Sequence, residues 1–173
     1  VKGKIGKYSF TQTIRLTQGE PRIDMSVKLD WTGNPRIGEP GIEFRADNPR
    51  KSFYDDRYKL LVYLPIQIAN QQIYKDAPFD VCESRLENTF FNRWDSIKHN
   101  IILNWVDVTS KDNSCGLSLF TDHTTSYAHG KDFPLALNVQ YAGKGLWGRD
   151  YIIDRPTEIS YALIPHAGTW EKS

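Results

Sequence analysis

The sequence predicts an all-β fold, an antiparallel β-sandwich, because apolar and polar residues alternate over many short segments that turn residues separate. No segment shows an apolar period of 3.6 residues over more than a turn or two, and the sequence contains no internal repeat. A chain of 173 residues can bury one substantial core, so we expect residues 1–173 to form a single domain.

The clearest prediction is a hairpin near the N-terminus. Apolar residues occupy alternate positions in residues 8–16 and again in residues 23–31, and the turn-rich residues 18–21 connect the two segments. We therefore expect two long antiparallel strands. Their predicted core-facing residues are Tyr8, Phe10, Ile14 and Leu16 in the first strand and Ile23, Met25, Val27, Leu29 and Trp31 in the second.

Apolar runs predict the remaining strands. Residues 59–68 are apolar on both faces, which is typical of a central strand, and Pro65 requires a bulge or a strand end. Residues 34–57 and 88–99 have no clear period, which indicates a long surface loop and an aromatic-rich loop or short helical turn. Strand character recurs in residues 101–108, 115–121, 133–141 and 158–164, the last of which we expect Pro165 to stop.

The composition argues against several classes of function. The chain has 22 basic and 21 acidic residues, so its net charge of +1 gives no electrostatic attraction to nucleic acid or to an anionic membrane. No apolar run approaches the ~20 residues of a transmembrane helix. Cys82 and Cys115 are too few for a disulfide framework or paired zinc ligands, which favours two buried free thiols. We expect a soluble protein, intracellular or periplasmic, that binds neither nucleic acid nor membrane.

Two groups of polar residues invite a catalytic or metal-binding interpretation. Asp55 and Asp56 are adjacent, so in an extended chain they point to opposite faces, and solvated charges fit better than a glycosidase pair. The predicted loop between residues 121 and 133 contains Asp122, His123, Tyr127 and His129, but their spacing matches no metal motif. Histidines exposed on a loop are the better interpretation.

The glycine-rich residues 143–151 contain the two candidates for substrate binding, Trp147 and Arg149. The segment lacks the strand-to-helix context of a phosphate-binding loop. An indole ring can stack on a sugar, and a guanidinium group can donate paired hydrogen bonds to it. The alternative is an ordinary turn with a packed tryptophan. The sequence predicts no catalytic residue and no metal ligand.

Five motifs follow one another in the second half of the chain: residues 78–85 (PFDVCESR), 104–108 (NWVDV), 116–122 (GLSLFTD), 135–137 (LAL) and 161–168 (YALIPHAG). In this order they resemble the C-terminal β domain of glycoside hydrolase family 38 α-mannosidases. The N-terminal hairpin also resembles the paired strands that precede this region in the family.

The resemblance implies a partial galactose-mutarotase-like super-sandwich and a retaining α-mannosidase as the parent. In the family, a metal, typically zinc, and the nucleophilic aspartate lie in an N-terminal α/β barrel. We therefore expect the chain to be a fragment of a longer multidomain glycosidase, with no cofactor of its own and the barrel as its partner. Arg149 corresponds to an arginine that reaches the sugar in some members, which makes a mannoside the implied ligand, and Trp147 is the neighbouring stacking candidate.

The sequence departs from the family pattern at two loops. Residues 123–127 (HTTSY) replace a Lys-Tyr-Gly-Tyr-Asp type segment of bacterial members, and residues 143–151 replace a proline-rich one. Three functions stay open: a non-catalytic sandwich domain of an α-mannosidase, a carbohydrate-binding module, and a purely structural docking sandwich. We interpret His166, at the end of the last strand, as a capping or docking residue.

Overall fold

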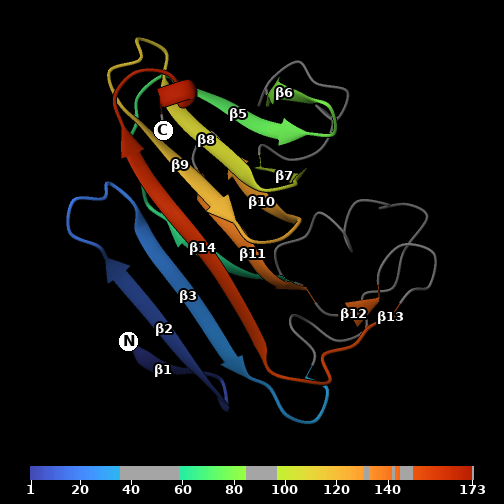
Figure 1. Cartoon of the computed structure of the whole chain (residues 1–173). Coiled ribbons are helices and arrows are strands. Elements are labelled where there is room, and N and C mark those ends of the chain that lie inside the picture. The colour runs from blue at the N-terminus through green and yellow to red at the C-terminus, as the bar shows by residue number, and fades with distance from the viewer. Residues whose placement is uncertain (36–58, 85–96, 131–132, 142, 145–149, 173) are drawn as a thin grey trace.

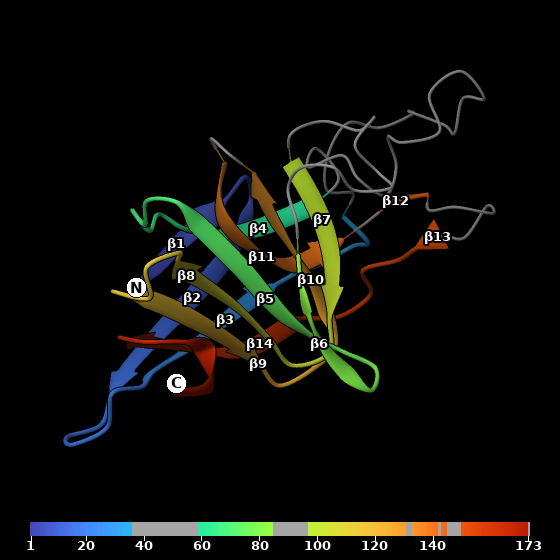
Figure 2. The same cartoon turned by 90° about the horizontal axis from the view of Figure 1, so that it is seen from above.

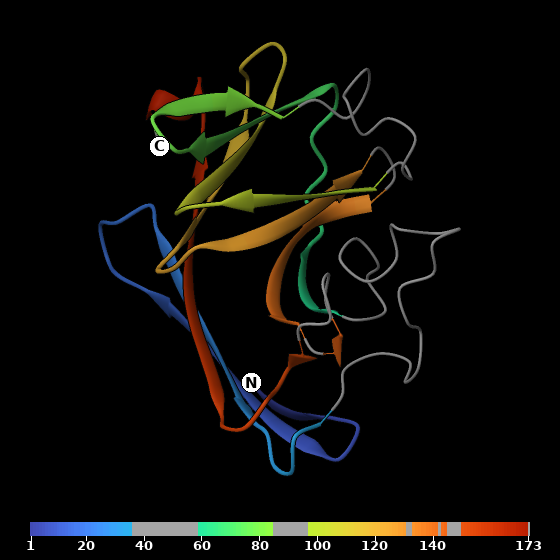
Figure 3. The same cartoon turned by 90° about the vertical axis from the view of Figure 1, so that its right-hand side faces the viewer.

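Two antiparallel sheets pack face to face in the computed structural model, which describes residues 1–35, 59–84, 97–130, 133–141, 143–144 and 150–172 (Figure 1). Figure 3 shows the two layers from the side, with the larger sheet on the left and strands β10 and β11 of the smaller sheet on the right. The predicted all-β sandwich is confirmed.

The larger sheet has eight strands in the order β1-β2-β3-β14-β9-β8-β5-β6. Their bounds are β1 Lys2–Ile5, β2 Tyr8–Leu16, β3 Ile23–Asp30, β5 Gln71–Ala77, β6 Asp80–Glu83, β8 Trp105–Ser110, β9 Gly116–Thr121 and β14 Thr157–His166. The smaller sheet, in the order β4-β11-β10-β7, consists of β4 Lys59–Leu64, β7 Ile97–Ile102, β10 Thr125–Gly130 and β11 Phe133–Tyr141. The short strands β12 Gly143–Lys144 and β13 Asp150–Tyr151 pair with each other, and a 3₁₀ helix spans Trp170–Lys172.

The predicted N-terminal hairpin is confirmed. Strands β2 and β3 pair in register from Ser9 opposite Asp30 to Leu16 opposite Ile23. One part of the prediction is wrong, because Ile14 and Leu16 are 53% and 72% exposed. The reason is that a sheet of four strands cannot cover all of a sheet of eight, so the outer part of β2 lacks a facing layer.

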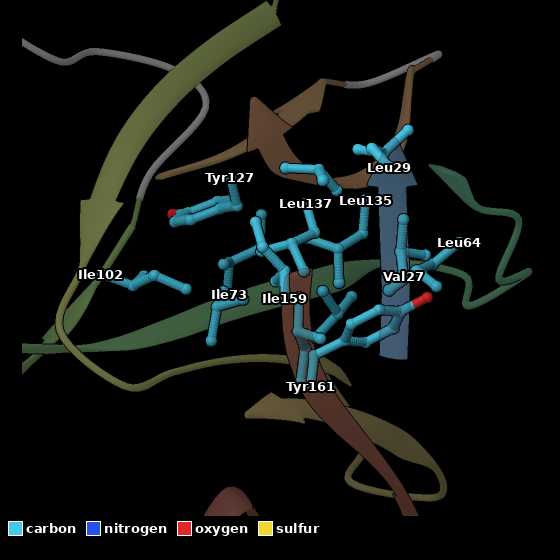
Figure 4. Packing of buried hydrophobic residues seen from close by; sticks show 14 of the residues in the cluster. Val27, Leu29, Leu64, Ile73, Ile102, Tyr127, Leu135, Leu137, Ile159 and Tyr161 are labelled. Carbon is cyan, nitrogen blue, oxygen red and sulfur yellow. The ribbon is translucent and has the colours of Figure 1, made fainter. Parts of the chain in front are cut away.

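The core lies between β3, β14, β9 and β8 of the larger sheet and β10 and β11 of the smaller one. Figure 4 shows this packing, with Tyr127 and Ile102 at one end of the cluster and Leu29 and Leu64 at the other. Burying each of these side chains stabilises the fold by about 1.5–3 kcal/mol. The large aliphatic residues that are 0% exposed include Ile102, Val106, Val108, Leu119, Leu135 and Leu137.

Two predicted strands are placed differently in the structure. Residues 59–68 were expected in a central strand, but β4 is an edge strand that ends at Leu64, just before Pro65. The apolar run 101–108 is divided between β7 and β8, which belong to different sheets. Residues 59–68 are apolar on both faces, and such a run does not show whether its strand lies at an edge. In residues 101–108, strand character alone does not show where the chain passes from one sheet to the other.

The predicted loop after residue 121 contains a strand. Residues 125–130 form β10 between β7 and β11, so Tyr127 and His129 are buried and the expectation of exposed loop histidines is wrong for His129. Ala128 is also fully buried. A strand buried on both faces has no polar alternation by which the sequence could reveal it.

The last strand continues past its predicted stop at Pro165. Strand β3 pairs with β14 only as far as Leu163, whereas β9 pairs with it as far as His166. Beyond Leu163, one edge of β14 therefore has no partner among the described strands. A residue without a backbone N–H is tolerated at such an edge.

The expected loops 34–57 and 88–99 lie almost wholly outside the described residues, as do Asp55 and Asp56. Both cysteines are free thiols, but they are exposed and not buried as expected. In the described part of the chain, no helix is long and apolar enough to cross a membrane.

Candidate functional site

The two predicted substrate-binding residues, Trp147 and Arg149, lie outside the described residues. The strands β12 and β13, which flank them, form a two-stranded ribbon. A polar cluster that the sequence did not single out lies elsewhere, on the outer face of the larger sheet. The outer face is the one turned away from the smaller sheet.

The alternation of β8 places an aspartate on this outer face. Val106 and Val108 point into the core and are fully buried, so Asp107 between them points the opposite way. Ser118 of β9 is directly opposite Asp107 in the sheet. His166, the last residue of β14, lies next to both. Two consecutive strands, β8 and β9, and the strand β14, which is remote from them in sequence, thus meet at one carboxylate.

The Asp107 carboxylate accepts three hydrogen bonds. The Ser118 hydroxyl donates to its Oδ2 over 2.6 Å, and His166 Nε2 lies 2.7 Å from the same oxygen. The Thr109 hydroxyl donates to Oδ1. An ionised carboxylate only accepts hydrogen bonds, so the proton between the two residues belongs to His166 Nε2. These donors compensate the cost of burying the charge.

Aromatic side chains surround the cluster on the outer face. Tyr74 of β5 is directly opposite Asp107, and Trp105 is two residues before it on β8. Trp170 of the 3₁₀ helix stacks on Trp105 with ring centroids 5.3 Å apart and lies 6.3 Å from the Tyr74 ring. The chain turns back over the sheet after β14 (Figure 1) and is held there by a hydrogen bond from the Gly168 N–H to the Asn113 carbonyl. As a result, the Asp107 and His166 side chains are only 0% and 4% exposed.

Gly116 of β9 provides the space for the imidazole ring. It lies between Thr109 of β8 and His166 of β14 in the sheet register. A methyl group added at Gly116 would lie 2.5 Å from Nε2 of His166 and 2.8 Å from the Thr109 hydroxyl oxygen. No real side chain fits at these distances without moving the ring, so the position requires glycine for close approach and not for backbone conformation.

The geometry of the cluster fits a structural role and not nucleophilic catalysis. In a catalytic triad the serine hydrogen-bonds the histidine, and the histidine bonds the aspartate through its other nitrogen. Here Ser118 and His166 both bond the same oxygen of Asp107, so no base is placed on the hydroxyl. His166 Nδ1 is buried and has no hydrogen-bond partner among the described residues. The Asp107 side chain is 0% exposed, so its carboxylate does not face solvent.

The polar residues of the segment between β9 and β11 do not come together as a metal site. Asp122 and His123 form an exposed pair with 2.5 Å between Oδ1 and Nδ1, whereas His129 is buried in β10. Burial lowers the pKa of His129 below its usual value of 6.5. Among the described residues, no group of three histidine, cysteine, aspartate or glutamate side chains could hold a metal ion. These residues therefore do not form a site for zinc, the metal that the family resemblance implies for the longer enzyme.

One open groove crosses the outer face beside the cluster. It has a volume of about 390 Å³ and runs over β2, β3, β14 and β9. Thr13, Ser26 and Ser160, which follow one another in the sheet register, give it a row of three hydroxyl groups. Arg15 and Phe120 also line it. This arrangement offers hydrogen bonds and the aromatic ring of Phe120 to a small polar ligand.

Comparison with known families identifies the chain. Residues 1–138 match the model of the glycosyl hydrolases family 38 C-terminal domain. The chain belongs to this family. Four of the five ordered motifs, from residues 78–85 to residues 135–137, lie within the matched range, as does the N-terminal hairpin. No match to the chain was found among curated proteins.

The polar cluster of this family 38 domain is built from three of those motifs. Asp107 belongs to residues 104–108, Ser118 to residues 116–122, and His166 to residues 161–168. The last motif follows the matched range, yet β14 lies between β3 and β9 and completes the larger sheet. The order of the motifs was a signal for the cluster, but only their three-dimensional pairing shows that they share a carboxylate.

Proposed function

We propose that the chain is the non-catalytic β-sandwich domain of a family 38 α-mannosidase and that it packs on the catalytic barrel of the same protein. The observation that carries this proposal is the family match over residues 1–138. The divalent metal, zinc in this proposal, and the nucleophilic aspartate would belong to the barrel. The domain would contribute stability, a docking surface and one contact with the mannoside.

The chemistry of the described residues supports a non-catalytic role. A retaining glycosidase needs two carboxyl groups about 5–5.5 Å apart on either side of the scissile bond, both accessible to the sugar. The Asp107 carboxylate is enclosed and already accepts hydrogen bonds from Ser118 and His166. Such a group stabilises a fold but cannot reach a substrate.

The test of the proposal compares the 173-residue chain with the full-length protein on an aryl α-mannoside, with and without added zinc. We expect zinc-dependent hydrolysis by the full-length protein only. Turnover by the 173-residue chain alone would contradict the proposal, and so would a full-length protein that is inactive on every α-mannoside despite bound zinc.

The proposed sugar contact has its own test. In the full-length enzyme, Arg149→Ala should lower kcat/KM for the aryl mannoside if the guanidinium group donates hydrogen bonds to the sugar. Trp147→Ala should raise KM if the indole ring stacks on the sugar. Arg155→Ala is the matched control, because Arg155 is an exposed arginine that pairs with its neighbour Asp154. Unchanged kinetics in Arg149→Ala would remove that residue from the site.

A second candidate function, carbohydrate binding by the domain itself, is favoured by the open groove on the outer face. Its hydroxyl row, Arg15 and Phe120 suit a neutral sugar. Titration of the 173-residue chain with an α-mannobioside by calorimetry tests it. Binding that Arg15→Ala abolishes and Lys28→Ala preserves would support a binding module, since Lys28 lies on the neighbouring strand β3 outside the groove. Absence of binding at millimolar sugar would exclude this function.

A further inference from the structure

The turn between β5 and β6 has an unusual backbone. The pairing of Ala77 with Asp80 leaves only Pro78 and Phe79 in the turn. The ring of Pro78 fixes a negative φ, whereas Phe79 has a φ of 76°. A negative φ followed by a positive one is the sign pattern of a type II turn, which favours glycine or asparagine at the second position. A two-residue hairpin also prefers the mirror-image turn types.

The backbone of Phe79 is therefore strained, because an L-residue with a bulky side chain disfavours a positive φ. Holding such a residue in the left-handed region lowers the folding equilibrium constant by about 5- to 30-fold. Strain of this kind persists only when other interactions offset it. Within the domain the Phe79 side chain gains nothing by it, because Phe79 is 106% exposed.

The hairpin that carries Phe79 is fixed at its base. The Asp76 carboxylate accepts hydrogen bonds from the backbone N–H groups of Leu103 at 2.9 Å and Asn104 at 2.6 Å. The Lys75 ammonium group donates to the carbonyl of Ile101 over 2.8 Å. In Figure 2 the turn stands at the periphery of the molecule, next to the end of β7. The hairpin whose turn carries Phe79 is thus tied at its base to the end of β7 and the residues that follow it.

Among the described residues, no other exposed large apolar side chain shares these properties. Ile14 and Leu16 lie in the regular strand β2, where exposure of an aliphatic side chain requires no strained backbone. Isolated apolar residues on a protein surface are normal and need no explanation. Phe79 differs because full exposure coincides with a strained φ and a rigid support.

We propose that Phe79 is the anchor by which this domain docks on the catalytic domain of its own enzyme, with the phenyl ring inserted into an apolar pocket of that domain. The proposal rests on the proposed function, which supplies the catalytic domain as the partner. An exposed aromatic side chain that is desolvated on docking is the type of residue that carries most of the energy of an interface. The docking energy offsets the strain that the isolated domain bears.

The direct test is hydroxyl-radical footprinting of Phe79 in the full-length enzyme and in the 173-residue chain. Because an anchor residue is fully desolvated in its pocket, we expect its oxidation rate to fall about tenfold in the full-length enzyme. Leu16 of the same samples serves as the reference side chain. Equal oxidation of Phe79 in both proteins would overturn the proposal. Protection that appears in the 173-residue chain alone and rises with its concentration would also overturn it, because the occupant would then be a second copy.

A substitution gives a second test with effects of opposite sign. Phe79→Asn should raise the folding equilibrium constant of the 173-residue chain by about fivefold, because asparagine tolerates a positive φ. In the full-length enzyme the same substitution should loosen the docking and raise the rate of proteolysis between the domains about tenfold or more. Leu16→Asn, the control at an exposed residue without strain, should change neither. A Phe79→Asn chain of lower stability, or an enzyme with unchanged proteolysis, would contradict the proposal.

The two proposals fail separately. A full-length enzyme that hydrolyses an aryl α-mannoside but leaves Phe79 unprotected would keep the proposed function and overturn the anchor. A full-length protein that protects Phe79 but is inactive on α-mannosides would keep the anchor and overturn the proposed function.

Discussion

His166 Nε2 and Asp107 Oδ2 are joined by a buried hydrogen bond of 2.7 Å, although 59 positions separate the two residues in the sequence. The bond connects the last residue of β14 to β8 across the intervening strand β9. Gly116 of β9 leaves the space that the imidazole ring fills. The contact therefore ties the C-terminal end of the last strand to the middle of the sheet.

Removing the histidine should destabilise the chain strongly. In His166→Ala the carboxylate of Asp107 stays buried but loses a donor, and breaking a buried pair in this way costs about 3–5 kcal/mol. His166→Gln keeps a donor and should cost less. Urea-induced unfolding, followed by circular dichroism, measures both. Glu158→Gln, at an exposed position of the same strand, should stay within about 0.5 kcal/mol of the unsubstituted chain. A His166→Ala chain as stable as this control would contradict the structural role of the pair.

A methyl group at Gly116 should displace the imidazole ring. Because the added Cβ would lie 2.5 Å from His166 Nε2, we expect Gly116→Ala to lower the free energy of unfolding by about 1–3 kcal/mol. In a His166→Ala background the same substitution should cost less, since the ring is gone and only the contact with the Thr109 hydroxyl oxygen at 2.8 Å remains. A double-mutant cycle in urea measures this coupling, and additive effects would show that Gly116 does not serve the histidine.

His129 should make the stability depend on pH. Burial lowers its pKa below the usual 6.5, so the folded chain keeps the ring neutral while the unfolded chain takes up a proton. The stabilising contribution is complete above pH 6.5 and is lost as the pH falls from 6.5 toward the folded pKa. A cavity of about 340 Å³ next to His129 is lined by Gln67, Gln71 and mainly apolar residues, and none of the described residues that line it is a carboxylate.

The matched variant for this prediction is His129→Phe, which keeps a ring and cannot titrate. The His129 Nδ1 has no hydrogen-bond partner among the described residues, so the substitution should cost little at pH 7.5. The difference in urea midpoint between the two chains should change in favour of the phenylalanine variant as the pH falls to 5. A constant difference would show that His129 takes up a proton as easily in the folded chain.

Both thiols should react in the native chain. Cys82 and Cys115 are free and exposed, so the thiol reagent DTNB should modify two groups per chain without denaturant. Cys82→Ser and Cys115→Ser should each remove one of them. A thiol that reacts with DTNB only in urea would show that its cysteine is buried in the native chain, which would contradict the exposed position in the structure.

The cysteines illustrate what local sequence cannot decide. Composition favours burial of a free cysteine, but Cys82 lies in the edge strand β6 and Cys115 just before β9. An edge strand differs from a central strand only in its neighbours, and those neighbours are set by distant parts of the chain. The same reason explains why residues 59–68 were expected in the centre of a sheet.

In the candidate site, too, the local sequence predicts one property and distant parts of the chain decide another. Asp107 alternates with two core valines, so the sequence predicts an outward-facing residue, and outward usually means solvent. Its burial depends on Ser118, on His166 and on the return of Trp170 over the outer face. The residues next to Asp107 in the sequence predict none of these contacts. The turn at Phe79 is similar, because a Pro-Phe pair does not reveal the φ of its second residue.

The sequence by itself determined the class of fold, the N-terminal hairpin and the family resemblance. Strand formation depends on a period of two residues, which is local and can be read from the order of residues alone. Only the tertiary structure decided which strands are neighbours, that β10 exists, and that His166 meets Asp107. The physical reason is that strand pairing and the burial of a charge depend on hydrogen bonds between residues far apart in sequence, and these become visible only when the sheet is assembled.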